Sequence, residues 1–210
     1  MSRVVLQDLS DGATRLVAAP TPAVGRTGVL IATRASLVSA GTERMLVDFG
    51  RASLLGKVRS QPQRVGEVLD KARTDGIGVT VDAVRSKLAQ PIPLGYSSAG
   101  VVLEVGADVR GLAVGDLVAA AGPHAETASV PVNLTAPIPD GVEPVDAAFA
   151  TVGSIALQGL RLAQPTVGER FVVIGLGLIG LLAVQLLQAQ GCTVLGVDPN
   201  PDRRRLAEGF

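Results

Sequence analysis

The sequence is poor in the residue types that most often mark disulfides, metal sites and aromatic cores. Its 210 residues include one cysteine, one histidine, one tyrosine and no tryptophan. The single cysteine, Cys192, excludes an internal disulfide framework and a four-cysteine zinc site. Aromatic residues make up only 2% and hydrophobic residues 47%, so a sizeable core must be built from Ala, Val, Leu and Gly. We therefore expect a folded protein with an aliphatic core.

The sequence also lacks an excess of charge and any long apolar run. Basic and acidic residues number 19 each, so no net field attracts nucleic acid or an anionic membrane. Residues 1–8 include an acid and lack the apolar region of a signal peptide. No apolar run reaches the ~20 residues of a membrane-spanning helix. We predict a cytoplasmic protein with a small-molecule substrate and with no nucleic-acid or membrane partner.

The most informative segment that is present reads FVVIGLGLIG and spans residues 171–180. A strand pattern runs directly into a G-x-G-x-x-G turn, which opens a helix pattern and leads to a second strand pattern. This arrangement is typical of a dinucleotide-binding βαβ unit, in which a pyrophosphate lies on the free N–H groups at the helix start. In that interpretation Gly175 permits the turn, Gly177 lets the backbone approach the pyrophosphate, and Gly180 lets helix and strand pack closely. The predicted cofactor-binding turn comprises Gly175, Leu176, Gly177, Leu178, Ile179 and Gly180. A glycine turn in an ordinary βαβ unit is the alternative.

An acid follows the second strand, at Asp198. This is the position where a carboxylate binds the 2′-hydroxyl of an adenosine ribose and repels a 2′-phosphate, so we predict NAD. Three arginines follow at 203–205, and an arginine can accept such a phosphate, so NADP stays open. Arg203 is the candidate for that contact.

The remaining patterns divide the chain into a β-rich part and a helical part. Val4–Leu6 and Ala13–Val17 flank Asp11-Gly12, a hairpin signal. Short strand patterns separated by Gly and Pro turns predict a small β-barrel, and a helical insert is predicted at 46–92 with helices at 65–72 and 80–88. The strand patterns lie at 28–38, 98–106, 116–120 and 125–130, and a helical pattern runs from Val145 to Leu162.

We therefore predict an α/β protein with a β-rich N-terminal domain over 1–150 and the first part of a Rossmann domain over 151–210. A dinucleotide domain has about six strands, and only two are visible here. We expect the chain to be part of a longer polypeptide.

Two stretches resemble the medium-chain dehydrogenases/reductases, the zinc-alcohol-dehydrogenase-like superfamily. Glu104-Val105-Gly106, Val109 and then Val114-Gly115-Asp116-Leu117-Val118 are similar to its E-V-G-x-x-V-x-x-x-x-V-G-D-x-V signature, and they precede the glycine turn in that family's order. The resemblance covers most of residues 25–208. It implies a GroES-like catalytic domain followed by a nicotinamide dinucleotide domain, and a homodimer of the full-length protein.

Within that superfamily the chain resembles the N-terminal half of the bi-domain oxidoreductases. The matching segments are Ser39–Glu43, the helical insert, Pro93–Gly100 and Ala156–Gly159. The resemblance implies a sugar or nucleotide-sugar derivative as substrate.

The zinc ligands of the superfamily are altered together. The segment that carries Cys in zinc members reads Ala40–Glu43, the Gly-His-Glu segment reads Gly95-Tyr96-Ser97, and the third reads Ala150–Gly153. Methyl and hydroxyl groups do not replace thiolate, imidazole or carboxylate, so we predict no catalytic zinc and, with one cysteine, no structural zinc.

Other groups must then stabilise the substrate oxygen and move its proton. The candidate catalytic residues are Tyr96 and Thr42, which offer hydroxyls, Glu43, which can orient one of them, and His124, a potential proton shuttle. The alternatives are a packing role for Tyr96, a helix start capped by Thr42 and Glu43, and a surface histidine.

The sequence thus predicts a zinc-independent, NAD(P)-dependent oxidoreductase that transfers hydride between a nicotinamide and a carbonyl or alcohol. Reduction of quinones or enones is one alternative. A non-catalytic nucleotide-binding module, or a truncated product, is another.

Overall fold

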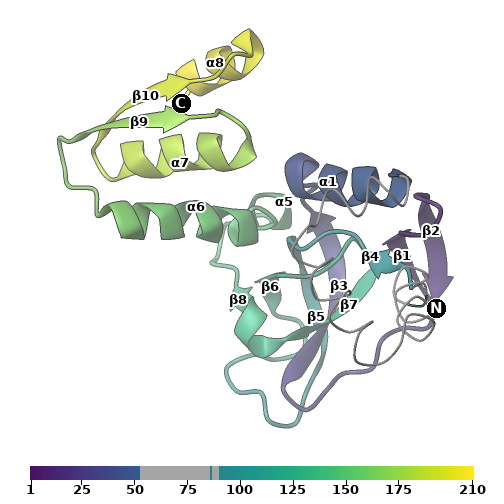
Figure 1. Cartoon of the computed structure of the whole chain (residues 1–210). Coiled ribbons are helices and arrows are strands. Elements are labelled where there is room, and N and C mark those ends of the chain that lie inside the picture. The colour runs from purple at the N-terminus through teal and green to yellow at the C-terminus, as the bar shows by residue number, and fades with distance from the viewer. Residues whose placement is uncertain (53–85, 87–89) are drawn as a thin grey trace, which may run out of the picture.

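The computed structural model describes residues 1–52, 86 and 90–210. The insert predicted at 46–92, with its helices at 65–72 and 80–88, lies mostly outside the described residues. Two sheets form the N-terminal part, and a helix leads from them to a βαβ unit (Figure 1).

The predicted hairpin is confirmed. β1 (Ser2–Gln7) and β2 (Thr14–Ala19) pair antiparallel in the register Ser2 to Ala19 and Gln7 to Thr14. The short strand β4 (Ile92–Pro93) pairs with the other side of β1 and completes a three-stranded sheet.

The second sheet contains the strands predicted for the barrel. Its order is β7-β3-β5-β6-β8, and all of its pairs are antiparallel. A buried aliphatic cluster that includes Val29, Ile31, Val102 and Val118 packs on it. The strands are β3 (Gly28–Ser36), β5 (Ser98–Val105), β6 (Leu117–Ala120), β7 (Thr127–Pro131) and β8 (Thr135–Pro137).

This sheet is curved but open, which corrects the predicted barrel. β7 and β8 lie at opposite edges, yet only the three-residue helix η1 (Val132–Leu134) joins them. Four extended steps cover at most ~14 Å, whereas four strand spacings in a flat sheet need ~19 Å, so the sheet must curl. Within the described part of the chain β7 and β8 do not pair with each other. Each strand ends in a proline, which has no N–H to donate, and β8 has only three residues.

Helices follow the strands of this sheet, and the last of them leads to the C-terminal unit. α1 (Ala40–Arg51) follows β3, and the short α5 (Pro144–Ala147) contacts β3, β5 and β6. The helical pattern predicted to Leu162 is confirmed by α6 (Ala150–Ala163), which ends where Gln164 adopts a left-handed conformation with φ of 50°.

The C-terminal unit is the predicted strand, helix and strand. β9 (Arg170–Ile174) and β10 (Thr193–Val197) pair in parallel, with Thr193 opposite Arg170. α7 (Leu178–Ala189) connects them and packs on α6, and α8 (Pro201–Glu208) follows β10 (Figure 1). Among the described residues, no helix combines the length and hydropathy needed to cross a membrane.

Candidate cofactor and active site

The glycine turn between β9 and α7 has two of its three predicted features in backbone geometry. Gly175 has φ of +92°, a conformation that L side chains rarely adopt, and its N–H donates to Val197 O across the strand pair. A Cβ built on Gly180 would lie 1.9 Å from Gly175 O, so helix and strand meet too closely for any side chain there. Both features fit the roles predicted for these glycines.

Gly177 leaves the start of α7 open. It is the N-cap residue, and a Cβ built on it would have nothing within 4 Å. The first backbone hydrogen bond of the helix runs from Leu181 N–H to Gly177 O at 2.8 Å. The N–H groups of Leu178, Ile179 and Gly180 precede it and have no carbonyl within the helix to bond. This end of the helix can therefore receive an anionic group at backbone N–H donors.

Asp198 lies directly after β10 and beside this turn, with 5% of its surface exposed. Its Oδ2 accepts from Leu176 N–H and its Oδ1 from Asn200 N–H, both at 2.8 Å. These two N–H groups hold the pKa of Asp198 below its usual value, and the nearby Arg203 guanidinium adds to the effect. The carboxylate thus ties the glycine turn to the end of β10. A carboxylate has about four lone-pair sites, so Asp198 can accept from a ribose hydroxyl in addition to the two N–H groups. The ribose contact stays a prediction.

Two arginines of α8 contact Asp198, one at its carboxylate and one at its backbone carbonyl. Arg203 Nη1 lies 3.5 Å from Asp198 Oδ2, and the Arg203 side chain is half exposed. Arg204, which the sequence reasoning did not select, donates from Nη1 to the carbonyls of Asp198 at 2.5 Å and Pro199 at 3.1 Å. Arg204 therefore fixes the loop after β10, and Arg203 keeps a guanidinium near the predicted ribose position.

A second polar cluster brings together three of the four predicted catalytic residues. His124 Nε2 lies 2.9 Å from Glu43 Oε2, and His124 Nδ1 lies 2.9 Å from Ser36 Oγ. Glu43 Oε1 accepts from Ser39 N–H at 2.7 Å, and Tyr96 OH donates to Ser39 Oγ at 2.8 Å. We call these five residues, Ser36, Ser39, Glu43, Tyr96 and His124, the polar network.

The network draws on three separate segments of the chain. Glu43 is buried in the first turn of α1, where its acceptance from Ser39 N–H also caps the helix, as the alternative interpretation held. Thr42 stands in the same turn but is exposed, and among the described hydrogen bonds none joins it to the network. The structure therefore does not group Thr42 with the other three candidates.

His124 is held in place by backbone bonds on both sides. Its N–H donates to Leu94 O at 2.7 Å, and its carbonyl accepts from Val5 N–H at 2.9 Å. A Cβ on Gly95, which has φ of +89°, would lie 2.7 Å from His124 Cγ, so the imidazole rests directly on the Gly95 backbone. The His124 side chain is 11% exposed, which is not the surface histidine of the alternative interpretation.

The three segments that hold zinc ligands in the resembled superfamily approach one another here. Tyr96 reaches Ser39, next to Ala40, through the hydrogen bond already described. Ser97 Oγ donates to Ala148 O at 2.5 Å, just before the third segment. Across the described residues there is no cluster of three or more His, Cys, Asp or Glu side chains that could hold a metal ion.

Two of the network residues, Ser36 and Ser39, were missed as site residues by the sequence reasoning. Ser39 had a local signal, because a serine four residues before a glutamate is close to a helix-capping pattern. Ser36 had none, since it meets His124 across 88 positions of the chain.

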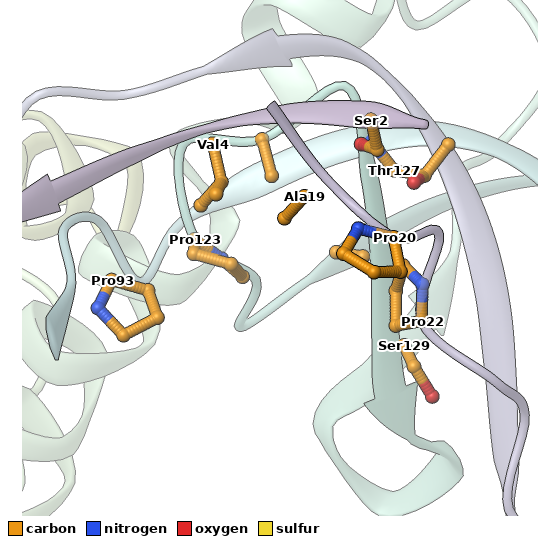
Figure 2. A pocket seen from close by; sticks show the side chains of 11 residues that line it. Ser2, Val4, Ala19, Pro20, Pro22, Pro93, Pro123, Thr127 and Ser129 are labelled. Atoms are coloured by element: carbon orange, nitrogen blue, oxygen red, sulfur yellow. The ribbon is translucent and has the colours of Figure 1, made fainter. Parts of the chain in front are cut away.

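A cavity of about 250 Å³ lies near the network but apart from it. Figure 2 shows Val4, Ala19 and four prolines around it, at the junction of β1, the segment after β2 and β7. Of the described residues that line it, none belongs to the network or to the glycine turn. The lining residues are Ser2, Val4, Ala19, Pro20, Pro22, Pro93, Pro123, Ala125, Thr127, Ala128 and Ser129.

Comparison with known proteins shows similarity to dehydrogenases. The chain is 37% identical over 130 residues to D-guloside 3-dehydrogenase of Escherichia coli (strain K12), which covers 60% of this chain and 37% of that protein. It is 27% identical over 198 residues to an alcohol dehydrogenase of Geobacillus stearothermophilus, covering 77% of this chain and 58% of that protein. No family model matches the chain.

The fold also matches solved structures along almost its whole length. Galactitol-1-phosphate dehydrogenase from Escherichia coli superposes with a TM-score of 0.73 at 22% identity, covering 99% of this chain and 59% of that one. These relatives and neighbours are members of the medium-chain, zinc-type alcohol dehydrogenase family. The chain thus has the GroES-like and Rossmann fold of that family, and it spans between about a third and three-fifths of the length of these proteins.

Proposed function

We propose that the chain is the catalytic part, with the start of the cofactor part, of an NAD(P)-dependent oxidoreductase. It transfers hydride between a nicotinamide and a carbonyl or alcohol substrate. The observation that carries this proposal is the glycine turn, where a positive φ at Gly175, an open helix start at Gly177 and a close contact at Gly180 occur together. The dehydrogenase names of the relatives support the same reaction class.

The residues of the turn fit a dinucleotide. The N–H groups of Leu178, Ile179 and Gly180 would hold the diphosphate, and Asp198 would accept from a ribose hydroxyl. NAD is proposed over NADP because the Asp198 carboxylate stays ionised and repels a 2′-phosphate. When bound, the nicotinamide supplies the hydride chemistry, and the protein positions it and excludes water.

The donor set does not fit a zinc ion, and we propose that the reaction proceeds without one. Ala40 carries only a methyl group, Tyr96 is already bonded to Ser39, and Thr151 Oγ1 lies 3.4 Å from Ala120 O. The polar network offers hydroxyl, imidazole and carboxylate groups instead. In this proposal Tyr96 accepts a hydrogen bond from the substrate hydroxyl, and Glu43 and His124 orient the site and hold its proton.

A sugar derivative is the proposed substrate class. The support is the similarity to D-guloside 3-dehydrogenase, which covers 37% of that protein. The three hydroxyls and one carboxylate of the polar network also suit a substrate that is itself rich in hydroxyls.

The test is a screen of the full-length oxidoreductase that contains this chain, with NAD and NADP, against glycosides and sugar alcohols, simple alcohols, quinones and enones. Turnover of glycosides or alcohols that survives a metal chelator supports the proposal. Turnover of quinones or enones alone would change the reaction class, and loss of activity with the chelator would refute zinc independence. Nucleotide binding without turnover of any substrate would favour a non-catalytic nucleotide-binding module. Sedimentation of the full-length protein tests the homodimer expected from the resemblance.

A further inference from the structure

Ser39 is the point where the two halves of the polar network meet. It is 7% exposed and precedes α1. Its N–H donates to Glu43 Oε1, its carbonyl accepts from Glu43 N–H at 2.9 Å, and its hydroxyl accepts from Tyr96 OH. One buried residue therefore contacts both the carboxylate and the phenol.

The Ser39 hydroxyl does not cap the helix, although Ser39 is the N-cap residue of α1. A serine at a helix N-cap ordinarily accepts from a backbone N–H of the first turn. Ser39 makes no such cap bond with its side chain. The Glu43 side chain takes over part of the capping role, and the Ser39 hydroxyl bonds to Tyr96, which is 57 positions away. The local helix start does not explain this contact.

We propose that Ser39 is a positioning residue for the reaction, an inference that rests on the proposed function. By accepting the hydrogen bond from Tyr96 OH, Ser39 fixes the phenol ring so that the lone pairs of the phenol oxygen can accept from a substrate hydroxyl. Through its N–H it holds the Glu43 carboxylate, which in turn contacts His124. Ser39 thus sets the distance between the phenol and the imidazole–carboxylate pair.

The composition of the chain makes this proposal testable at single sites. Tyr96 is the only tyrosine, there is no tryptophan, and His124 is the only histidine. The tyrosine Fermi doublet in a Raman spectrum therefore reports the hydrogen bonding of Tyr96 alone. The imidazole ¹⁵N shifts, in protein prepared without a histidine tag, report His124 alone.

The test compares Ser39→Ala, Ser39→Thr and the control Ser154→Ala in the 210-residue chain. Ser154 is an exposed residue of α6 that donates to Thr151 O, far from the network in sequence. We expect the doublet of the wild type and of Ser39→Thr to show a phenol that donates, and that of Ser39→Ala to show loss of this bond. The His124 ¹⁵N shifts should stay unchanged in Ser39→Ala, because the bond to Glu43 uses the Ser39 backbone.

In turnover, Ser39→Ala should lower kcat by about tenfold with little change in KM, and Ser39→Thr should restore it. That loss is smaller than the ~10²–10⁴-fold that removal of an acid–base group itself costs. The double variant Ser39→Ala/Tyr96→Phe should lose no more kcat than Tyr96→Phe alone, because both substitutions remove the same hydrogen bond between Tyr96 and Ser39. This comparison keeps the proposal falsifiable if one single variant folds poorly.

An unchanged Raman doublet in Ser39→Ala overturns the proposal. So does a changed doublet in Ser39→Ala with an unchanged kcat. Fully additive effects of Ser39→Ala and Tyr96→Phe on kcat also overturn it. A full-length wild-type protein without nicotinamide-dependent turnover overturns the proposed function, and with it the reaction role of Ser39. The Raman result separates these two failures, because it does not depend on activity.

Discussion

Alanine at Gly180 is expected to destabilise the glycine turn, although alanine normally favours a helix. The new Cβ would lie 1.9 Å from Gly175 O and 3.0 Å from Gly175 C, and both are backbone atoms. Since real Cβ atoms essentially never come within 3.0 Å of such atoms, the start of α7 or the end of β9 must move by about an ångström.

The magnitude follows from two opposing terms. Overpacking of a well-packed site costs ~1–3 kcal/mol, and replacing a helical glycine with alanine returns up to ~1 kcal/mol. We therefore expect Gly180→Ala to lower the free energy of unfolding by about 1–2 kcal/mol. Urea denaturation followed by circular dichroism measures this loss as a shift of the midpoint.

The matched control is Gly159→Ala in α6, where a Cβ would have nothing within 4 Å. That substitution should raise the free energy of unfolding by roughly 0.5–1 kcal/mol, because only the helix preference changes. Opposite signs for the two glycine substitutions support the close contact of helix and strand. Gly180→Ala as stable as the wild type, or more stable, would refute the reasoning.

Three further predictions concern the charged and titratable groups. Glu43→Ala should lower the free energy of unfolding by about 1–3 kcal/mol, because it leaves the buried Ser39 N–H without an acceptor; an unchanged urea midpoint would contradict this. ¹⁵N NMR of His124 should show the proton on Nε2, since a carboxylate only accepts; a proton on Nδ1 in the neutral imidazole would place the Glu43 contact in doubt. The folded state lowers the pKa of Asp198, so its contribution to stability is present above about pH 4 and is lost as the pH falls through the folded-state value. Asp198→Asn should therefore remove part of the acid sensitivity of unfolding, and equal pH profiles of the two proteins would show that Asp198 does not contribute.

The fold was largely predictable because its elements have local signals. The strand at 170–174, the glycine turn and the helix at 178–189 follow from periodicity and from three glycines with separate steric roles. The open sheet was not predictable in the same way. The sheet closes into a barrel only if its edge strands β7 and β8 pair with each other. Strand patterns in the sequence carry no information on that pairing.

The candidate site residues also differ in whether local sequence signals could identify them. The cofactor turn is contiguous, so its residues could be selected from the sequence, whereas the polar network joins residues up to 88 positions apart. Glu43 and Tyr96 were found through the resemblance of their segments, and His124 was found as the only histidine of the sequence. Ser36 required the tertiary structure, and so did the bond between Ser39 and Tyr96 and the finding that both oxygens of Asp198 already accept backbone N–H groups.

The most direct test of the central claim is a calorimetric titration of the full-length oxidoreductase that contains this chain with NADH and NADPH. We predict that NADH binds, that NADPH binds more weakly because of the Asp198 carboxylate, and that Gly177→Ala weakens NADH binding by at least about tenfold, or ~1.4 kcal/mol. Gly177→Ala leaves open space around the new Cβ in the free protein, so its loss of binding would reflect blocked approach of the diphosphate. Absence of binding for both nucleotides, or NADH binding that is unaffected by Gly177→Ala, would contradict the account.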